Sequence, residues 1–134
     1  MVSKSQVPNP NEIPSPNSQS GRKPYDLRER TFEFAVRMLA VAAAVPMVGY
    51  SKMIAGQLSR SGPSVGANVE EAHGAVSKAD KRRAFVIARK EVRETRYWLR
   101  LIDRLLGPEL PVREDIQEAT ELLYILSAII GKLE

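Results

Sequence analysis

The sequence predicts an all-α fold: an antiparallel up-down-up-down four-helix bundle that follows a disordered N-terminal tail. Two observations lead to this prediction. From residue 26 onward, apolar residues recur at steps of three and four, the spacing of one face of a helix, and no segment sustains the alternation of a half-buried strand. The stretches between the periodic segments are short, and short connections favour antiparallel helix neighbours.

Residues 1–24 differ from the rest of the chain. They hold five of its nine prolines, together with Ser, Asn and Gln, and have too little apolar surface to offset the entropy of ordering them. We expect this tail to be disordered and residues 25–134 to form one domain.

The tail has no apolar block typical of a signal peptide, and the longest uncharged run, Met38 to Ser51, is too short for a membrane-spanning helix of roughly 20 residues. The sequence therefore predicts a cytoplasmic protein of bacterial type, with no membrane partner.

The first two helices follow from their apolar stripes. The first helix is expected to begin after Asp26, a possible cap, and to stop before Pro46. Its stripe consists of Leu27, Phe34, Met38, Ala42 and Val45. The stripe of the second helix alternates steps of four and three, through Ile54, Leu58, Ser61, Val65, Asn68 and Ala72.

The third and fourth helices carry a seven-residue repeat. The third is expected over residues 78–106 and ends at the GPELP stretch, where Gly107 and Pro108 stop it. Its stripe is Phe85, Ala88, Val92, Thr95, Leu99, Ile102 and Leu106. The fourth helix is expected over residues 113–133, with a stripe of Ile116, Ala119, Leu123, Leu126, Ile130 and Leu133. A repeat close to 3.5 residues favours shallow helix crossing in a bundle.

The second helix contains an unusual stretch, SRSGPSVGANVEEAHGAVS (residues 59–77), in which helical spacing continues through helix-breaking residues. Gly62 and Gly66 lie one turn apart, so another helix or subunit could approach the backbone closely there. That contact would have to offset about 1 kcal/mol of lost helix propensity per glycine. Pro63 removes one backbone hydrogen bond, so we expect a kink or a new helical start at this residue.

Asn68 falls on the apolar side of the second helix. A buried amide without a partner costs about 1–3 kcal/mol, so we expect a hydrogen bond from Ser64, Glu71 or Glu94. The favoured role for Asn68 is a buried polar group that fixes helix register. A ligand-binding or catalytic role is the alternative.

Two stretches carry a resemblance to a known family: QLSRSGPSVGANVEEAHGAVSKAD (residues 57–80) and KEVRETRYWLRL (residues 90–101). Across roughly residues 25–133, the chain resembles the four-helix-bundle proteins encoded in intervening sequences of bacterial 23S ribosomal RNA genes. The resemblance implies a small bundle that assembles as a ring-shaped homopentamer, and Glu94 corresponds to a glutamate of the family pattern. A related branch, the accessory variability protein of diversity-generating retroelements, shares the bundle and binds nucleic acid together with a reverse transcriptase. The basic run KRRAFVIARK (residues 81–90) departs from the family pattern, which raises the chance of a local functional difference.

Several classes of chemical site are excluded or unsupported. Without cysteine there is no disulfide, thiolate zinc site or cysteine nucleophile. His73 is the only histidine, which excludes a two-histidine metal site and leaves a Ser-His triad without a supporting motif. A phosphate-loop motif fails because Gly66 is followed by Ala67 rather than lysine. We therefore predict no catalytic residue, no metal and no cofactor.

The strongest feature is a basic stripe on the third helix. Residues 77–106 hold ten basic and four acidic residues, although the whole chain carries only +4. Six arginines lie roughly 110 degrees from the apolar line of this helix. They are Arg82, Arg89, Arg93, Arg96, Arg100 and Arg104. Arginines four residues apart repel each other by a few tenths of a kcal/mol per pair, so we expect an anionic partner.

Two partners suit this stripe. Phosphates of RNA or another nucleic acid bind guanidinium groups in bidentate fashion. Alternatively, Glu114, Glu118 and Glu121 of the fourth helix are predicted to face away from the core of their own subunit, and they could meet the arginines of a neighbour in a head-to-tail ring. An ordinary solvated face is the third interpretation.

Ile87 and Trp98 broaden the apolar arc of the third helix beyond what one bundle seam needs. This breadth favours an oligomer in which Trp98 is an interface anchor. The alternative is that Trp98 closes the edge of the bundle within one subunit.

Together these features predict a non-enzymatic, homo-oligomeric four-helix bundle, a pentamer if it follows the family it resembles. Its expected activity is binding of structured RNA or another nucleic acid through phosphate contacts. Tyr97 and Trp98 are the only candidates for aromatic stacking, so the sequence does not support stacking of single-stranded nucleic acid. The alternative is an adaptor or scaffold that recruits a partner protein and whose arginines pair with the acids of a neighbouring subunit.

Overall fold

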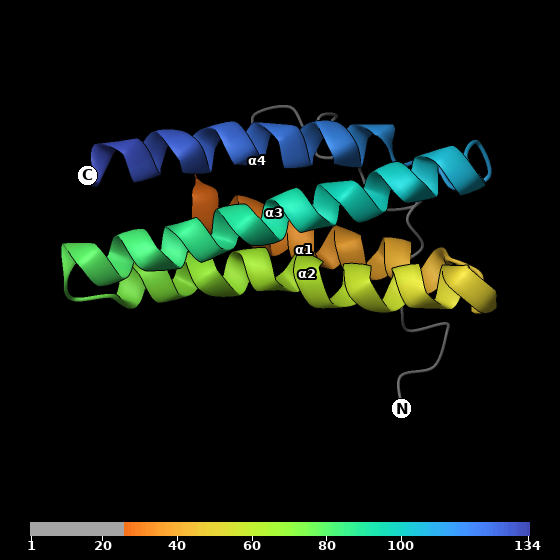
Figure 1. Ribbon diagram of the computed structural model, residues 1–134, viewed down its shortest axis with the longest axis horizontal. Helices are drawn as coiled ribbons and strands as arrows, with labels where there is room; N and C mark the ends of the chain where they lie inside the picture. Colours follow the sequence, from red (N-terminus) through yellow and green to blue (C-terminus); the bar gives the residue numbers. More distant parts are fainter. Residues whose placement is uncertain (1–25) are drawn as a thin grey trace.

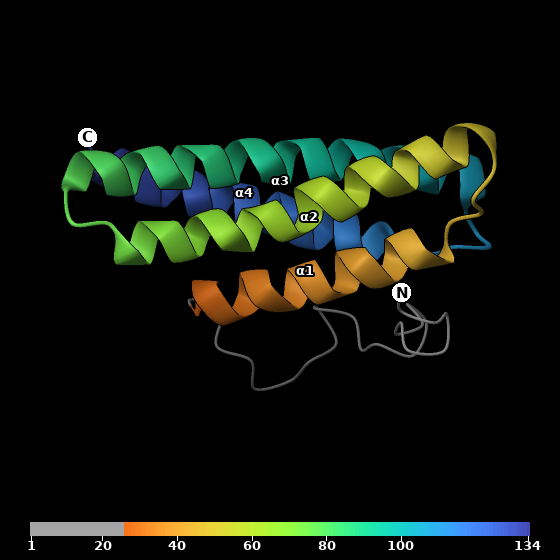
Figure 2. The ribbon, with the colours of Figure 1, turned by 90° about the horizontal axis from the view of Figure 1, so that it is seen from below.

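Four helices lie side by side along the long axis of the protein, and successive helices run in opposite directions (Figures 1 and 2). The structure is a computed structural model that describes residues 26–134. The helices are α1 (Leu27–Ala44), α2 (Gly49–Gly74), α3 (Lys78–Leu106) and α4 (Arg113–Lys132). The predicted four-helix fold is confirmed, whereas the tail predicted for residues 1–24 lies outside the described residues.

The helix ends follow local sequence signals. The side chain of Asp26 accepts a hydrogen bond from the backbone N–H of Glu29 at the start of α1, as predicted for a cap. Ser77 does the same for Asp80 at the start of α3. Pro46 follows the end of α1, and Gly107 follows the end of α3. These signals set helix lengths that let short connections join neighbouring helices.

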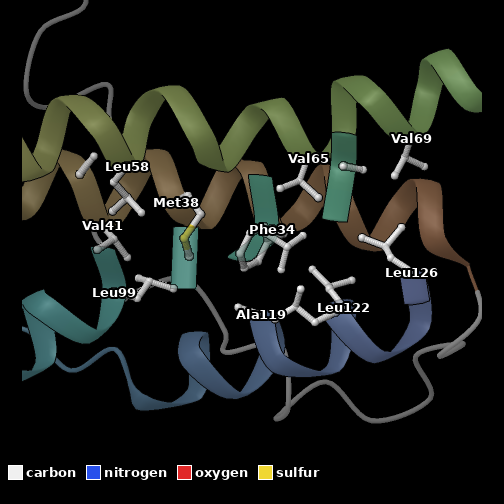
Figure 3. Packing of buried hydrophobic residues seen from close by; sticks show 14 of the residues in the cluster. Phe34, Met38, Val41, Leu58, Val65, Val69, Leu99, Ala119, Leu122 and Leu126 are labelled. Carbon is white, nitrogen blue, oxygen red and sulfur yellow. The ribbon is translucent and has the colours of Figure 1, made fainter. Parts of the chain in front are cut away.

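The core runs along the centre of the bundle and receives side chains from every helix (Figure 3). Phe34 and Met38 of α1 meet Leu58 of α2, Leu99 of α3 and Leu122 of α4, all of them buried. α2 packs against α1 and α3, and α3 packs against α4. None of the helices over residues 26–134 is long and apolar enough to cross a membrane.

The two seam positions occupied by hydroxyl residues are paired with each other. Ser61 of α2 and Thr95 of α3 are buried, and Thr95 Oγ1 lies 2.8 Å from Ser61 Oγ. Thr95 Oγ1 also donates to the backbone carbonyl of Glu91, at 2.7 Å. Because buried polar atoms are costly unless bonded, this pair satisfies two buried hydroxyl groups between α2 and α3.

The glycines of α2 allow α1 to approach closely, as predicted. A Cβ atom added at Gly62 would lie 2.5 Å from the Cβ of Met38, and one added at Gly66 would lie 3.2 Å from the carbonyl oxygen of Thr31. α2 continues unbroken through Pro63, so the alternative of a new helical start there is wrong. The ribbon of α2 instead bends along its length (Figure 2), as expected when proline removes one hydrogen bond and crowds the preceding turn.

Candidate nucleic-acid interface

Most of the predicted arginine stripe lies on α3 along the side that faces α4, whereas Arg93 lies toward α2, beside Arg60. Two of its members reach across to hydroxyl groups of α4. Arg89 lies 3.4 Å from Ser127 Oγ, and Arg96 lies 3.4 Å from Thr120 Oγ1. The structure therefore places the stripe on the outer face of α3, where Arg93, Arg100 and Arg104 are open to solvent.

Most of the stripe has no acidic partner within residues 26–134. Arg82 forms an ion pair with Glu134, at 3.0 Å. Arg89 and Arg96 have only the neutral partners on α4, and the exposed side chains of Arg93, Arg100 and Arg104 have no hydrogen bond or ion pair among the described residues. The like charges are thus not neutralised within the described part of the chain.

The C-terminal part of the stripe borders a groove between α3 and the start of α4. This groove, called here the α3–α4 groove, has a volume of about 570 Å³. Arg100, Arg104 and Arg113 supply its cations, while Leu101 and Ile116 supply apolar surface. Its single acid, Asp103, accepts a hydrogen bond from Arg113 Nε, at 3.3 Å. The groove therefore has a net positive charge and an apolar lining.

A second group of arginines has a different environment, between α1 and α4. Arg30 donates two hydrogen bonds to the carboxylate of Glu118, at 2.8 and 2.6 Å, and a third to Glu121, at 3.0 Å. Arg37 donates two hydrogen bonds to Asp115, at 2.8 and 3.1 Å. Glu118 and Asp115 are each only 1% exposed. These bidentate pairs hold α1 against α4 in the interior of the bundle.

The predicted orientation of the α4 acids was wrong for Glu118 and Glu121. Both bind Arg30 within the same chain instead of facing away from its core. The predicted apolar stripe of α4 runs through Ile116 and Leu123. In the structure Leu122 is fully buried, so the side of α4 that faces the core also includes Glu118. The signal that sequence reasoning missed is that Arg30 and Arg37 are seven residues apart and flank the apolar stripe of α1.

Burial and ion pairing shift the pKa values of these groups in opposite directions. The hydrogen bond to Glu118 raises the pKa of Arg30 above its ordinary value, and burial opposes this rise. For Asp115, burial raises the pKa of the carboxyl group above its ordinary value, and the hydrogen bonds from Arg37 only partly offset the rise. The two pairs therefore serve mainly to satisfy buried charges.

The remaining polar residues of the α2 motif make local contacts. Asn68 is half-buried and donates to the carbonyl oxygen of Ser64, at 2.8 Å, so Ser64 is the partner among the three proposed candidates. Glu71 is exposed. Glu94 accepts a hydrogen bond from Arg60 of α2, a residue that sequence reasoning did not single out. This contact lies within α2, so the role of fixing the register between helices stays a prediction for Asn68.

The apolar residues predicted at an oligomer interface differ in exposure. Trp98 is half-buried and packs against the core, so within one protomer it closes the edge of the bundle. Ile87 is exposed. More exposed apolar side chains occur elsewhere, on α1, in the connection from α1 to α2 and in the first turns of α2. They are Phe32, Leu39, Met47, Val48, Tyr50 and Met53, and we call them the α1 apolar surface.

Comparisons with known proteins agree with this architecture. A crystal structure of a protein of unknown function from the S23 ribosomal protein family, from Bacteroides thetaiotaomicron, is similar with a TM-score of 0.68 and 35% sequence identity. The match covers 78% of this chain and 97% of that protein. A search of curated proteins found no match. The sequence model of the family described as 23S rRNA-intervening sequence protein matches residues 23–130, and the chain therefore belongs to this family.

Proposed function

We propose that this protein is a non-enzymatic, homo-oligomeric bundle of the cytoplasm that binds RNA through phosphate contacts from α3. The observation that carries the proposal is the set of exposed arginines without acidic partners among the described residues: Arg93, Arg100 and Arg104. From Arg89 to Arg104 the stripe spans fifteen residues, which is about 22 Å at the rise of an α-helix. That length can follow several phosphates of one strand.

The ion pairs of α1 make the competing salt network less favourable. An intersubunit network would need Glu114, Glu118 and Glu121 to be available to the arginines of a neighbour. Glu118 is buried against Arg30, and Glu121 also binds Arg30. Only exposed Glu114 then remains from that set, which is too few acids for the α3 stripe. Phosphate is the anion that better fits a row of guanidinium groups.

The test is RNA affinity after charge reversal. The variant Arg93→Glu with Arg100→Glu should bind a labelled structured RNA at least about tenfold more weakly than the wild type, because two phosphate contacts become repulsive. Fluorescence anisotropy at fixed, low salt measures this change.

The matched control is Lys52→Glu with Lys132→Glu, which changes the net charge equally on exposed residues of α2 and α4. This control should retain most of the affinity. Equal losses in the two double variants would mean that net charge alone attracts RNA, and the α3 surface would then be wrong.

A second candidate function, a protein adaptor, is favoured by the α1 apolar surface. Four of its residues, Met47, Val48, Tyr50 and Met53, are at least half exposed and lie within seven residues of the chain. Exposed apolar patches mark interaction surfaces. We propose that this surface contributes to self-association, alongside the predicted positions Ile87 and Trp98. Light scattering of the wild type and of Phe32→Ser with Leu39→Ser tests this, and the variant should have a smaller mass. An unchanged mass would exclude α1 from the interface.

A further inference from the structure

Tyr97 occupies a position on α3 that the phosphate contacts alone do not explain. Its side chain is 54% exposed and lies between two grooves that it borders on both sides. One is the α3–α4 groove. The other, the α2–α3 groove, has a volume of about 470 Å³. An exposed aromatic ring between two such grooves is available for stacking.

Both grooves offer cations close to the ring. In the α3–α4 groove these are Arg100, Arg104 and Arg113, of which Arg113 binds Asp103. In the α2–α3 groove, Arg60 is already paired with Glu91 and Glu94. Lys90 and Arg93 of that groove have no acidic partner among the described residues. A ligand lying across the ring would therefore meet free positive charge on each side.

The ring of Tyr97 is also held in a defined orientation. It packs edge-to-face on Trp98, with ring centroids 5.2 Å apart and an interplanar angle of 78°. Trp98 is itself fixed against the core. An aromatic side chain that is supported on one edge and exposed elsewhere loses little freedom when a flat ligand stacks on it.

We propose that Tyr97 is a stacking platform for one unpaired nucleotide of RNA. The base lies on the Tyr97 ring, the phosphate on one side binds Arg93, and the phosphate on the other side binds Arg100 and Arg104. This inference rests on the proposed RNA binding and adds to it a preference for a bulge or strand end over continuous duplex.

The exposed aromatic residues of α3 determine how many RNA bases can stack on this helix. Phe85 is buried and Trp98 is half-buried, so Tyr97 is the exposed aromatic side chain among the residues of this helix. A platform for a long single strand needs several rings in succession. One ring accommodates one base, so the expected ligand is a single unpaired nucleotide within otherwise paired RNA.

Three labelled hairpins test the proposal with the full-length protein. The first has one bulged adenosine, the second has an abasic nucleotide at the bulge, and the third has no bulge. Base stacking on an aromatic side chain gives at least about a fivefold gain in affinity. The adenosine hairpin should therefore bind about fivefold or more tightly than the abasic hairpin, which has the same phosphates. Tyr97→Leu should abolish this difference, and Tyr97→Phe should keep it.

Each outcome has a distinct meaning. Equal binding of the three hairpins by the wild type would overturn the stacking platform while leaving phosphate binding intact. A preference for adenosine that persists in Tyr97→Leu would also overturn it, because the base would then stack elsewhere. If none of the hairpins binds at low salt, the proposed function itself fails, and this inference fails with it. Circular dichroism establishes that the Tyr97 variants keep the helical fold.

Discussion

Arg30 and Arg37 of α1 are buried against the acids of α4, whereas Arg93 and Arg100 of α3 are exposed and have no acidic partner among the described residues. The first group lies where two helices meet and makes bidentate contacts with carboxylates. The second lies on an outer face and crowds like charges at helical spacing. Arginine therefore stabilises the fold between α1 and α4, whereas on α3 it is available to bind an external anion.

The difference shows why the context of a charge matters more than its number. A buried arginine must be paired, because an uncompensated charge in the interior is strongly destabilising. An exposed arginine is solvated at little cost and can exchange water for phosphate. Mutations that separate folding from the proposed RNA binding should therefore divide between the two regions.

The largest expected effect is on stability, from Arg30→Ala. This change removes the guanidinium that donates two hydrogen bonds to the buried carboxylate of Glu118. Loss of one partner of a buried pair costs about 3–5 kcal/mol, so the unfolding free energy should fall by about that amount in urea denaturation. The double variant Arg30→Met with Glu118→Leu should recover most of the loss. A single variant as stable as the wild type would mean that the pair does not hold α1 against α4.

A smaller effect is expected at the contact between α1 and α2. Gly62→Ala places a methyl group 2.5 Å from the Cβ of Met38, so α1 must shift. Overpacking of this kind costs about 1–3 kcal/mol, partly offset by about 1 kcal/mol of helix propensity. Thermal unfolding should show a net loss. The matched control is Gly56→Ala in the same helix, where an added Cβ meets no atom within 4 Å and the variant should be more stable. A stabilised Gly62→Ala would show that the two helices are not in close contact.

The pH dependence of the α1–α4 pairs should have a defined sign. Burial raises the pKa of Asp115 above its ordinary value of 3.8, so the folded state binds more protons than the unfolded state just above that pH. The contribution of Asp115 to stability is then present at low pH and is lost as pH rises through the folded pKa. Relative to Asp115→Asn, the wild type should therefore lose stability as pH rises through this window. A relative gain would show that Arg37 outweighs burial.

The smallest effect on stability is expected on α3. Arg93→Ala and Arg100→Ala remove exposed side chains without partners among the described residues, so the unfolding free energy should change by less than about 0.5 kcal/mol. Any increase in the unfolding free energy would come from relief of repulsion between neighbouring arginines. A loss as large as that of Arg30→Ala would erase the distinction between the two regions.

The fold was predictable because local patterns and global packing agree. Steps of three and four mark each helix, and Asp26, Pro46 and Gly107 mark helix ends where the structure has them. The close approach of α1 at Gly62 was also predictable, since two glycines one turn apart have no other advantage in a helix interior.

The ion pairs between α1 and α4 were not predicted because they depend on which side of α4 faces the core. Periodicity alone does not decide whether Leu122 or Ile116 is the more buried residue of α4. The side of α4 that is buried determines whether Glu118 faces α1 or solvent. Tyr97 presents a similar case: the sequence places it between Arg96 and Trp98, but only the structure shows how the Tyr97 ring packs on Trp98.

The most direct test of the central claim is the salt dependence of RNA binding. For the wild type, the logarithm of the association constant should fall steeply and linearly with the logarithm of the salt concentration. Arg93→Gln with Arg100→Gln should reduce that slope by about one for each arginine that contacts phosphate, with no change in unfolding free energy. A slope that is unchanged in this variant would contradict the assignment of α3 as the RNA-binding face.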